Sequence, residues 1–206
     1  SDLPVDKICK AGCIPFTYAP SDAAFYTTSI VHAVAAQYEG LEQYKLRESL
    51  GGEEGVEYTF PAGSYSQAEC TEHGLTYNAD GTATGIINYQ NAYLLTQMGG
   101  TQKAIEFVER LFGNDKKYLD PDLKQITQSF SETQKSFINS SKASESGRNQ
   151  AIAMLIDGEW WENEARGHFD NMATAFGQRY AYGKRDFRFM PLPGMDGAKE
   201  TSSVIH

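Results

Sequence analysis

The sequence predicts an α/β protein in which an open mixed sheet is flanked by helices. Residues 151–156 are all apolar, which is the pattern of a short strand buried on both faces. Residues 14–19 combine aromatic and β-branched side chains, which favour a second strand. After each strand, a short acidic turn leads into a helical pattern that opens with aromatic residues. Two strand–turn–helix units of this kind are typical of an α/β sheet.

The composition disfavours several classes of function. The chain has 206 residues, enough for one large domain or two small ones. No apolar run reaches the ~20 residues that a membrane-spanning helix needs. The net charge of −9 repels phosphate groups, so neither nucleic acid nor an anionic lipid surface is expected as a partner. The 12 tyrosines and 11 phenylalanines instead suit a polar ligand with apolar faces.

The cysteines do not form a metal-site pattern. Cys9 and Cys13 lie four residues apart, and no second pair completes a zinc site. Free thiols are favoured over a disulfide from Cys13 to Cys9 or to Cys70, and no metal or other cofactor is expected. The chain begins at Ser1 without a signal peptide or initiator methionine, as expected for a piece of a longer protein, so its start leaves the compartment open.

Turn and cap residues divide the chain into elements. Gly12 is expected to end a helix before strand 14–19, and residues 20–22 form a turn that caps a helix ending at Gly40. Residues 41–50 continue as a second short helix. The later predicted elements are helices over 89–98, 101–112, 131–138 and 160–176, strand 151–156, and a strand that starts at Phe187 and ends in a Pro-rich exit.

One segment differs in character from this framework. At about 48–88, glycines alternate with tyrosines and threonines, which predicts loops and a β-hairpin turning near Asp80-Gly81. Residues 1–206 are therefore expected to form a single α/β lobe with an insertion at about 48–88.

The strongest candidate site lies where strand 151–156 ends. Asp157 and Gly158 are expected to form a turn, because glycine permits positive φ and aspartate accepts backbone hydrogen bonds. Trp160 and Trp161 follow at the carboxyl end of the strand, where open α/β sheets bind ligands. We predict that Trp160 is exposed and that Trp161 packs inward. In the plainer alternative, the exposed ring merely covers a helix end.

Carboxylates surround both strand–turn–helix junctions. They are Asp22, Asp157, Glu159, Glu162 and Glu164. Aromatic rings cover the C–H face of a sugar and carboxylates bind its hydroxyl edge, so a carbohydrate suits this combination. Two carboxylates facing a cleft also suit glycosidase chemistry, and the sequence alone does not separate the two. There is no Gly-x-Ser-x-Gly motif for an α/β-hydrolase.

Several motifs together resemble a known family. In chain order they are Gly12-Cys13-Ile14-Pro15-Phe16, the aromatic segment 22–26, Ala104-Ile105-Glu106-Phe107-Val108, Asp120-Pro121, Phe137, Ala153-Met154, Gly158-Glu159-Trp160 and Pro191-Leu192-Pro193. Their order and spacing resemble the second lobe of maltose-binding-protein-like extracellular solute-binding proteins, which serve bacterial ABC sugar importers.

The resemblance implies a periplasmic-binding-protein-like lobe and assigns roles to some residues. It implies that Trp160 stacks on a sugar, and Asp22 and Tyr26 match the family's aromatic segment more loosely. Glu159 and Trp161 join the candidate ligand-binding residues because of their position in the chain.

The function expected from these observations is non-enzymatic capture of a mono- or oligosaccharide in an inter-lobe cleft, for an ABC-type sugar import system. The alternative is a glycoside hydrolase domain with Asp22 and Glu159 as its carboxylate pair. The resemblance further implies a monomer, permease subunits in the membrane as partners, and an extracellular or periplasmic location with a lipid anchor.

Overall fold

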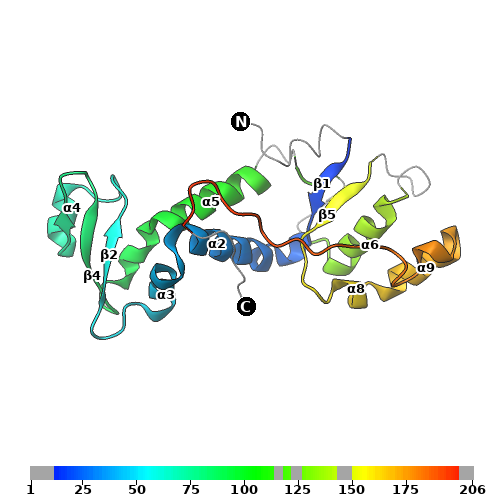
Figure 1. The fold of residues 1–206 in the computed structure, drawn as a ribbon, viewed down its shortest axis with the longest axis horizontal. Helices are drawn as coiled ribbons and strands as arrows, with labels where there is room; N and C mark the ends of the chain where they lie inside the picture. The colour runs from blue at the N-terminus through cyan, green and yellow to red at the C-terminus, as the bar shows by residue number, and fades with distance from the viewer. Residues whose placement is uncertain (1–11, 114–117, 122–126, 143–149, 200–206) are drawn as a thin grey trace. The chain divides into compact units, whose positions relative to one another are not determined.

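The computed structural model describes residues 12–113, 118–121, 127–142 and 150–199 (Figure 1). The chain is a mixed α/β protein, as predicted, with helices flanking two small sheets. It forms two compact units, named here unit 1 (Ser1–Thr28 and Arg110–Phe189) and unit 2 (Ser29–Glu109 and Met190–His206). That residues 1–206 form a single lobe stays a prediction. The helix expected before Gly12, like Cys9, falls outside the described residues.

Unit 1 contains a parallel strand pair. Strand β1 (Ile14–Thr17) pairs with β5 (Ile152–Leu155), with Ile14 opposite Ile152 and Thr17 opposite Leu155 (Figure 1). Because the strands are parallel, their carboxyl ends meet at the same edge. The turns that follow both strands therefore start from one edge, as the two similar junctions in the sequence suggest.

Strand β5 differs from its prediction. β1 is buried along its whole length, whereas in β5 only Ile152 is buried and Ala153 is exposed. Within the described residues β5 pairs with β1 alone, so it is an edge strand and not a central one. The apolar run was correct as a strand signal, but burial on both faces was wrong.

Helices pack beside this sheet. They are η1 (Pro20–Asp22), the start of α2 (Ala23–Glu39), α6 (Phe130–Ser140), α8 (Trp161–Glu164), α9 (Arg166–Phe176) and η3 (Gln178–Tyr180). The helix expected over 160–176 is interrupted at Ala165, a fully buried residue. The capping box of α6 is formed by Ser129 and Glu132, two residues before the predicted start at Ser131.

An aromatic cluster fills the core under α8. The ring of Trp161 lies 5.5 Å from that of Phe137, 4.9 Å from Phe187 and 5.9 Å from Phe169. The strand predicted from Phe187 is absent. Phe187 packs against the aromatic cluster, whereas Phe189, the next aromatic residue of this segment, is exposed. The segment therefore lacks the alternating burial of a strand.

Unit 2 surrounds an antiparallel sheet of strand order β2-β4-β3. Its elements are the end of α2, α3 (Leu41–Ser49), β2 (Val56–Phe60), α4 (Gln67–His73), β3 (Thr76–Tyr77), β4 (Ala83–Ile87), η2 (Ala92–Gln97) and most of α5 (Gly99–Phe112). The predicted hairpin turn is present: Gly81 N–H donates to Asn78 O at 3.0 Å. The surrounding segment is not loop-like, however. It carries α4, and its buried side chains share one core with Leu46, Leu94 and Met98.

A buried carboxylate in unit 2 joins two of its helices. Glu39, at the end of α2, accepts hydrogen bonds from the Gly100 N–H at the start of α5 and from the Tyr58 hydroxyl, at 3.0 and 2.9 Å from its two oxygens. A Cβ at Gly100 would lie 2.7 Å from Ala35 O, so only glycine permits this approach. The negative charge lies at a helix N-terminus, where the helix dipole stabilises it.

Two further findings concern the cysteines and the helices. Cys13 and Cys70 are free thiols, as expected. Among the described helices, none combines the length and apolarity needed to cross a membrane.

Candidate ligand-binding site

The carboxyl edge of the parallel strands carries a hydrogen-bonded turn centred on Asp157. One carboxylate oxygen, Oδ1, accepts the Gly158 N–H at 2.8 Å and the Tyr26 hydroxyl at 3.3 Å. The other oxygen, Oδ2, accepts the side-chain amide of Gln134 at 3.1 Å. Three donors from three segments fix the carboxylate, so Asp157 acts as an acceptor that holds the turn in place.

Gln134 connects this turn to a second carboxylate. Its Nε2 also donates to Glu164 Oε2 at 3.0 Å, so one amide group holds Asp157 and Glu164 near each other. The Gln134 side chain has no exposed surface, and its Oε1 has no hydrogen-bond partner. An unpaired buried acceptor is unusual in a folded protein and calls for an explanation.

Tyr26 is a buried residue next to the carboxylates of Asp157 and Glu164. It is 7% exposed and belongs to the first turns of α2. Burial raises the pKa of the Tyr26 hydroxyl above its ordinary value, and the charge of Asp157, its hydrogen bond, and the charges of Asp22 and Glu164 raise this pKa further. The hydroxyl therefore stays protonated and donates to Asp157.

Trp160 is 49% exposed, which confirms the exposure predicted from its position. Its indole lies over the backbone of Gly158. A Cβ added to Gly158 would be 2.2, 2.3 and 2.4 Å from ring atoms Cη2, Cζ2 and Cζ3. These nearly equal distances place that point above the face of the ring and not beyond its edge. One face of the indole therefore rests on the turn, and the other is directed away from it.

The reason for glycine at position 158 differs from the predicted one. Gly158 does not have a positive φ, so the turn makes no special demand on its backbone conformation. A side chain is instead excluded because the Trp160 ring fills the space. The expectation of a positive φ was wrong.

The other predicted residues take different places. Trp161 belongs to the aromatic core, as expected from its neighbours, and is therefore poorly placed to contact a ligand. Asp22 is exposed and accepts a hydrogen bond from the Ser21 hydroxyl at 2.7 Å. Glu159 is exposed beside Trp160. The structure thus brings Tyr26, Asp157 and Glu164 together.

The role of Gln134 was not predicted from the sequence, where this residue is only part of the helix expected over 131–138. A signal was present, because Gln134 lies three and four residues before Phe137 and Ile138, on the buried face of α6. A polar residue in such an apolar stripe has to find a hydrogen-bond partner in the folded protein.

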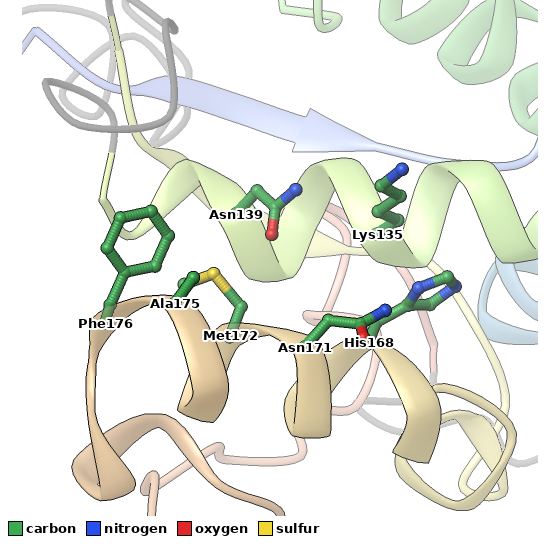
Figure 2. A pocket seen from close by; sticks show the side chains of 7 residues that line it. All are labelled: Lys135, Asn139, His168, Asn171, Met172, Ala175 and Phe176. Carbon is green, nitrogen blue, oxygen red and sulfur yellow. The ribbon is translucent and has the colours of Figure 1, made fainter.

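A separate groove lies between α6 and α9 (Figure 2). Its volume is about 170 Å³, and it is lined by Lys135, Asn139, His168, Asn171, Met172, Ala175 and Phe176. The Nε2 atom of His168 lies 3.0 Å from the Ser131 hydroxyl. Burial lowers the pKa of His168, and the charge of Lys135 lowers it further.

Within the described residues, no group of three or more His, Cys, Asp or Glu side chains is placed to hold a metal ion. Comparison with known proteins found no matching family model, no matching curated protein and no matching solved structure. The resemblance to solute-binding proteins accordingly remains an expectation from the sequence.

Proposed function

We propose that this chain binds a carbohydrate without changing it chemically, as the capture component of an ABC-type sugar import system. The observation that carries the proposal is the half-exposed indole of Trp160, supported on Gly158 at the carboxyl edge of two parallel strands. A flat aromatic face beside hydrogen-bond acceptors suits a pyranose ring, which has an apolar C–H face and a hydroxyl edge.

In this proposal the residues have separate roles. Trp160 stacks on the sugar ring, and the exposed carboxylates of Asp22, Glu159 and Glu164 accept hydrogen bonds from its hydroxyl groups. Asp157 and Tyr26 hold the turn in place, because their polar atoms already form a hydrogen bond with each other.

The wider assignment follows the family resemblance. Residues 1–206 would form the second lobe of a periplasmic-binding-protein-like fold, with an insertion at about 48–88, and the sugar would be held in a cleft completed by the first lobe. Permease subunits would be the partners, and the protein would act as a monomer outside the cytoplasmic membrane, held there by a lipid anchor.

The size of the Trp160 contribution can be calculated from its exposure. A buried aromatic side chain covers ~150–250 Å², and with 49% of Trp160 open, about 100 Å² is free for a sugar. At ~25 cal/mol per Å², stacking on that area contributes about 2.5 kcal/mol at most. Trp160→Ala should then weaken sugar binding roughly ten- to a hundredfold.

The test is a screen of mono- and oligosaccharides by saturation-transfer NMR, which detects millimolar binding, followed by titration of Trp160→Ala. Phe130→Ala is the matched control, because Phe130 is a similarly exposed aromatic residue of unit 1, at 44%. If Trp160→Ala binds the best sugar as well as Phe130→Ala does, the proposed site is wrong.

The second candidate function is glycoside hydrolysis. One observation favours it, namely that a single amide holds the carboxylates of Asp157 and Glu164 near each other. Asp157 nonetheless accepts three hydrogen bonds, which suits an acceptor better than a proton donor. Release of reducing ends from a bound oligosaccharide, abolished by Glu164→Gln or Glu159→Gln, would favour hydrolysis over capture.

A further inference from the structure

We propose that the carbohydrate bound beside Trp160 carries a protonated amine, so that an amino sugar binds more tightly than its neutral counterpart. This inference rests on the proposed function and narrows its ligand class. It comes from the charge around the site, the hydrogen-bonding groups that the site offers, and the aromatic surface next to them.

The charge around the Tyr26 hydroxyl is negative. The charged groups that perturb this hydroxyl are Asp157, Asp22 and Glu164, and all three are carboxylates. Asp22 and Glu164 are exposed, and Glu159 adds a third exposed carboxylate next to Trp160 in the chain. Carboxylates gathered on one rim attract a cation and repel an anion.

The hydrogen-bonding groups around the turn are acceptors. Three of the donors there, the Tyr26 hydroxyl, the Gly158 N–H and the Gln134 amide, are already used on Asp157 and Glu164. Among the described residues, Gln134 donates one hydrogen bond to the Glu164 carboxylate, which leaves further lone pairs open within this part of the chain. A ligand that only donates hydrogen bonds therefore fits better than one that must also accept them, and an ammonium group has three donors and no acceptor.

Gln134 gives an independent observation that points to a ligand. Its Oε1 is fully buried and has no partner, although the same amide group contacts both carboxylates. A buried unpaired acceptor beside Asp157 and Glu164 is a place where a further donor is stabilised.

The aromatic neighbour adds attraction for a cation. The open face of Trp160 carries the negative part of the ring quadrupole, and tryptophan is the strongest of the aromatic side chains in cation–π contacts. A sugar with an ammonium substituent stacks through its C–H face and places its positive charge between the ring and the carboxylates.

The experiment compares three probes against the full 206-residue chain: glucosamine, N-acetylglucosamine and glucose, each also as a β-1,4-linked trimer. Acetylation removes the charge and keeps the sugar ring. We expect glucosamine or its trimer to bind about tenfold more tightly than the two uncharged forms, with the difference reduced at high salt. Binding is measured by saturation-transfer NMR and by tryptophan fluorescence.

The variant Glu164→Gln separates charge from stacking. It should remove most of the preference for glucosamine, and it should weaken the binding of glucose, which loses only one hydrogen-bond acceptor there, less than the binding of glucosamine. Asp170→Asn is the matched control, since Asp170 is an exposed carboxylate on the neighbouring helix α9. It should keep the preference.

The outcomes distinguish this inference from the proposed function. Equal binding of the charged and uncharged sugars overturns the inference and leaves sugar capture standing. Binding of none of the three sugars overturns both. If methylammonium binds as tightly as glucosamine, the site recognises the amine alone, which overturns the carbohydrate assignment.

Discussion

Replacement of Gly158 by alanine tests the geometry of the site without removing any of its side chains. The new Cβ would lie 2.2–2.4 Å from three ring atoms of Trp160. Carbon atoms in contact prefer a separation of about 3.5–4.0 Å, so the indole has to move by roughly 1–2 Å. The backbone need not change, because Gly158 has no positive φ.

Gly158→Ala should weaken ligand binding and leave the free energy of unfolding almost unchanged. The ring that must move is the exposed end of a side chain, so the free energy of unfolding should change by less than about 1 kcal/mol. Part of the stacking surface is lost when the ring tilts away from the turn. Affinity for the best sugar should therefore fall about three- to tenfold.

The assay is fluorine NMR of protein labelled with 5-fluorotryptophan. The chain has two tryptophans, so the spectrum contains one signal for exposed Trp160 and one for Trp161, which is partly buried against the aromatic core. In Gly158→Ala the Trp160 signal should shift and the Trp161 signal should stay. Gly167→Ala is the control, because a Cβ at Gly167 meets nothing within 4 Å.

An unshifted Trp160 signal in Gly158→Ala would show that the indole does not rest on the turn. Unfolding of the variant would show that the space over Gly158 is part of the core. Either result refutes the argument from the ring position.

Three further predictions concern stability, each measured by chemical denaturation. Tyr58→Phe removes hydrogen bonds to the buried carboxylate of Glu39 and should cost about 1.5–3 kcal/mol, against about 0.5–1.5 kcal/mol for Tyr65→Phe, which loses one bond to a backbone carbonyl; equal costs would contradict this. Leu50→Gly should stabilise by about 0.5–1 kcal/mol, because Leu50 ends α3 at φ 53 in the left-handed region and is 41% exposed; a loss of stability would be the wrong sign. Burial lowers the pKa of His168 below its ordinary value of 6.5 in the folded state, so between that value and the lowered pKa the unfolded chain binds more protons; stability falls as the pH drops through this window and levels off below the lowered pKa. His168→Gln should flatten that fall, and an unchanged pH profile would refute it.

Much of the site's framework could be predicted from local patterns in the sequence. The apolar run at 151–156 and the mixed stretch at 14–19 are strand signals, and both strands are present within one or two residues. The change from apolar to polar residues at Asp157 also marks the end of a strand correctly. Each of these signals depends on neighbours in the chain, where burial and turn preferences act directly.

The parts that could not be predicted depend on contacts between distant residues. Ser131 carries as good a capping pattern as Ser129, and the packing of α6 against the strands decides between them. The segment at 48–88 looks like loops because its strands are short and the residues between them include many glycines. Its apolar residues become a core only when they meet Leu46, Leu94 and Met98 from outside the segment.

The register of the parallel strands explains why the site exists where it does. Thr17 lies opposite Leu155, and Ile156 N–H donates to Thr17 O at 2.9 Å. The two strands therefore end at the same level of the sheet. Tyr26 and Asp157 are 131 positions apart in the sequence, yet their side chains meet just beyond this edge. In a parallel pair, a shift of the register by one residue would reverse the faces of β5 and turn Asp157 away from Tyr26. The hydrogen bonds among Tyr26, Asp157 and Gln134 therefore stabilise the register as well as the turn. The register and the turn together determine the position of Trp160.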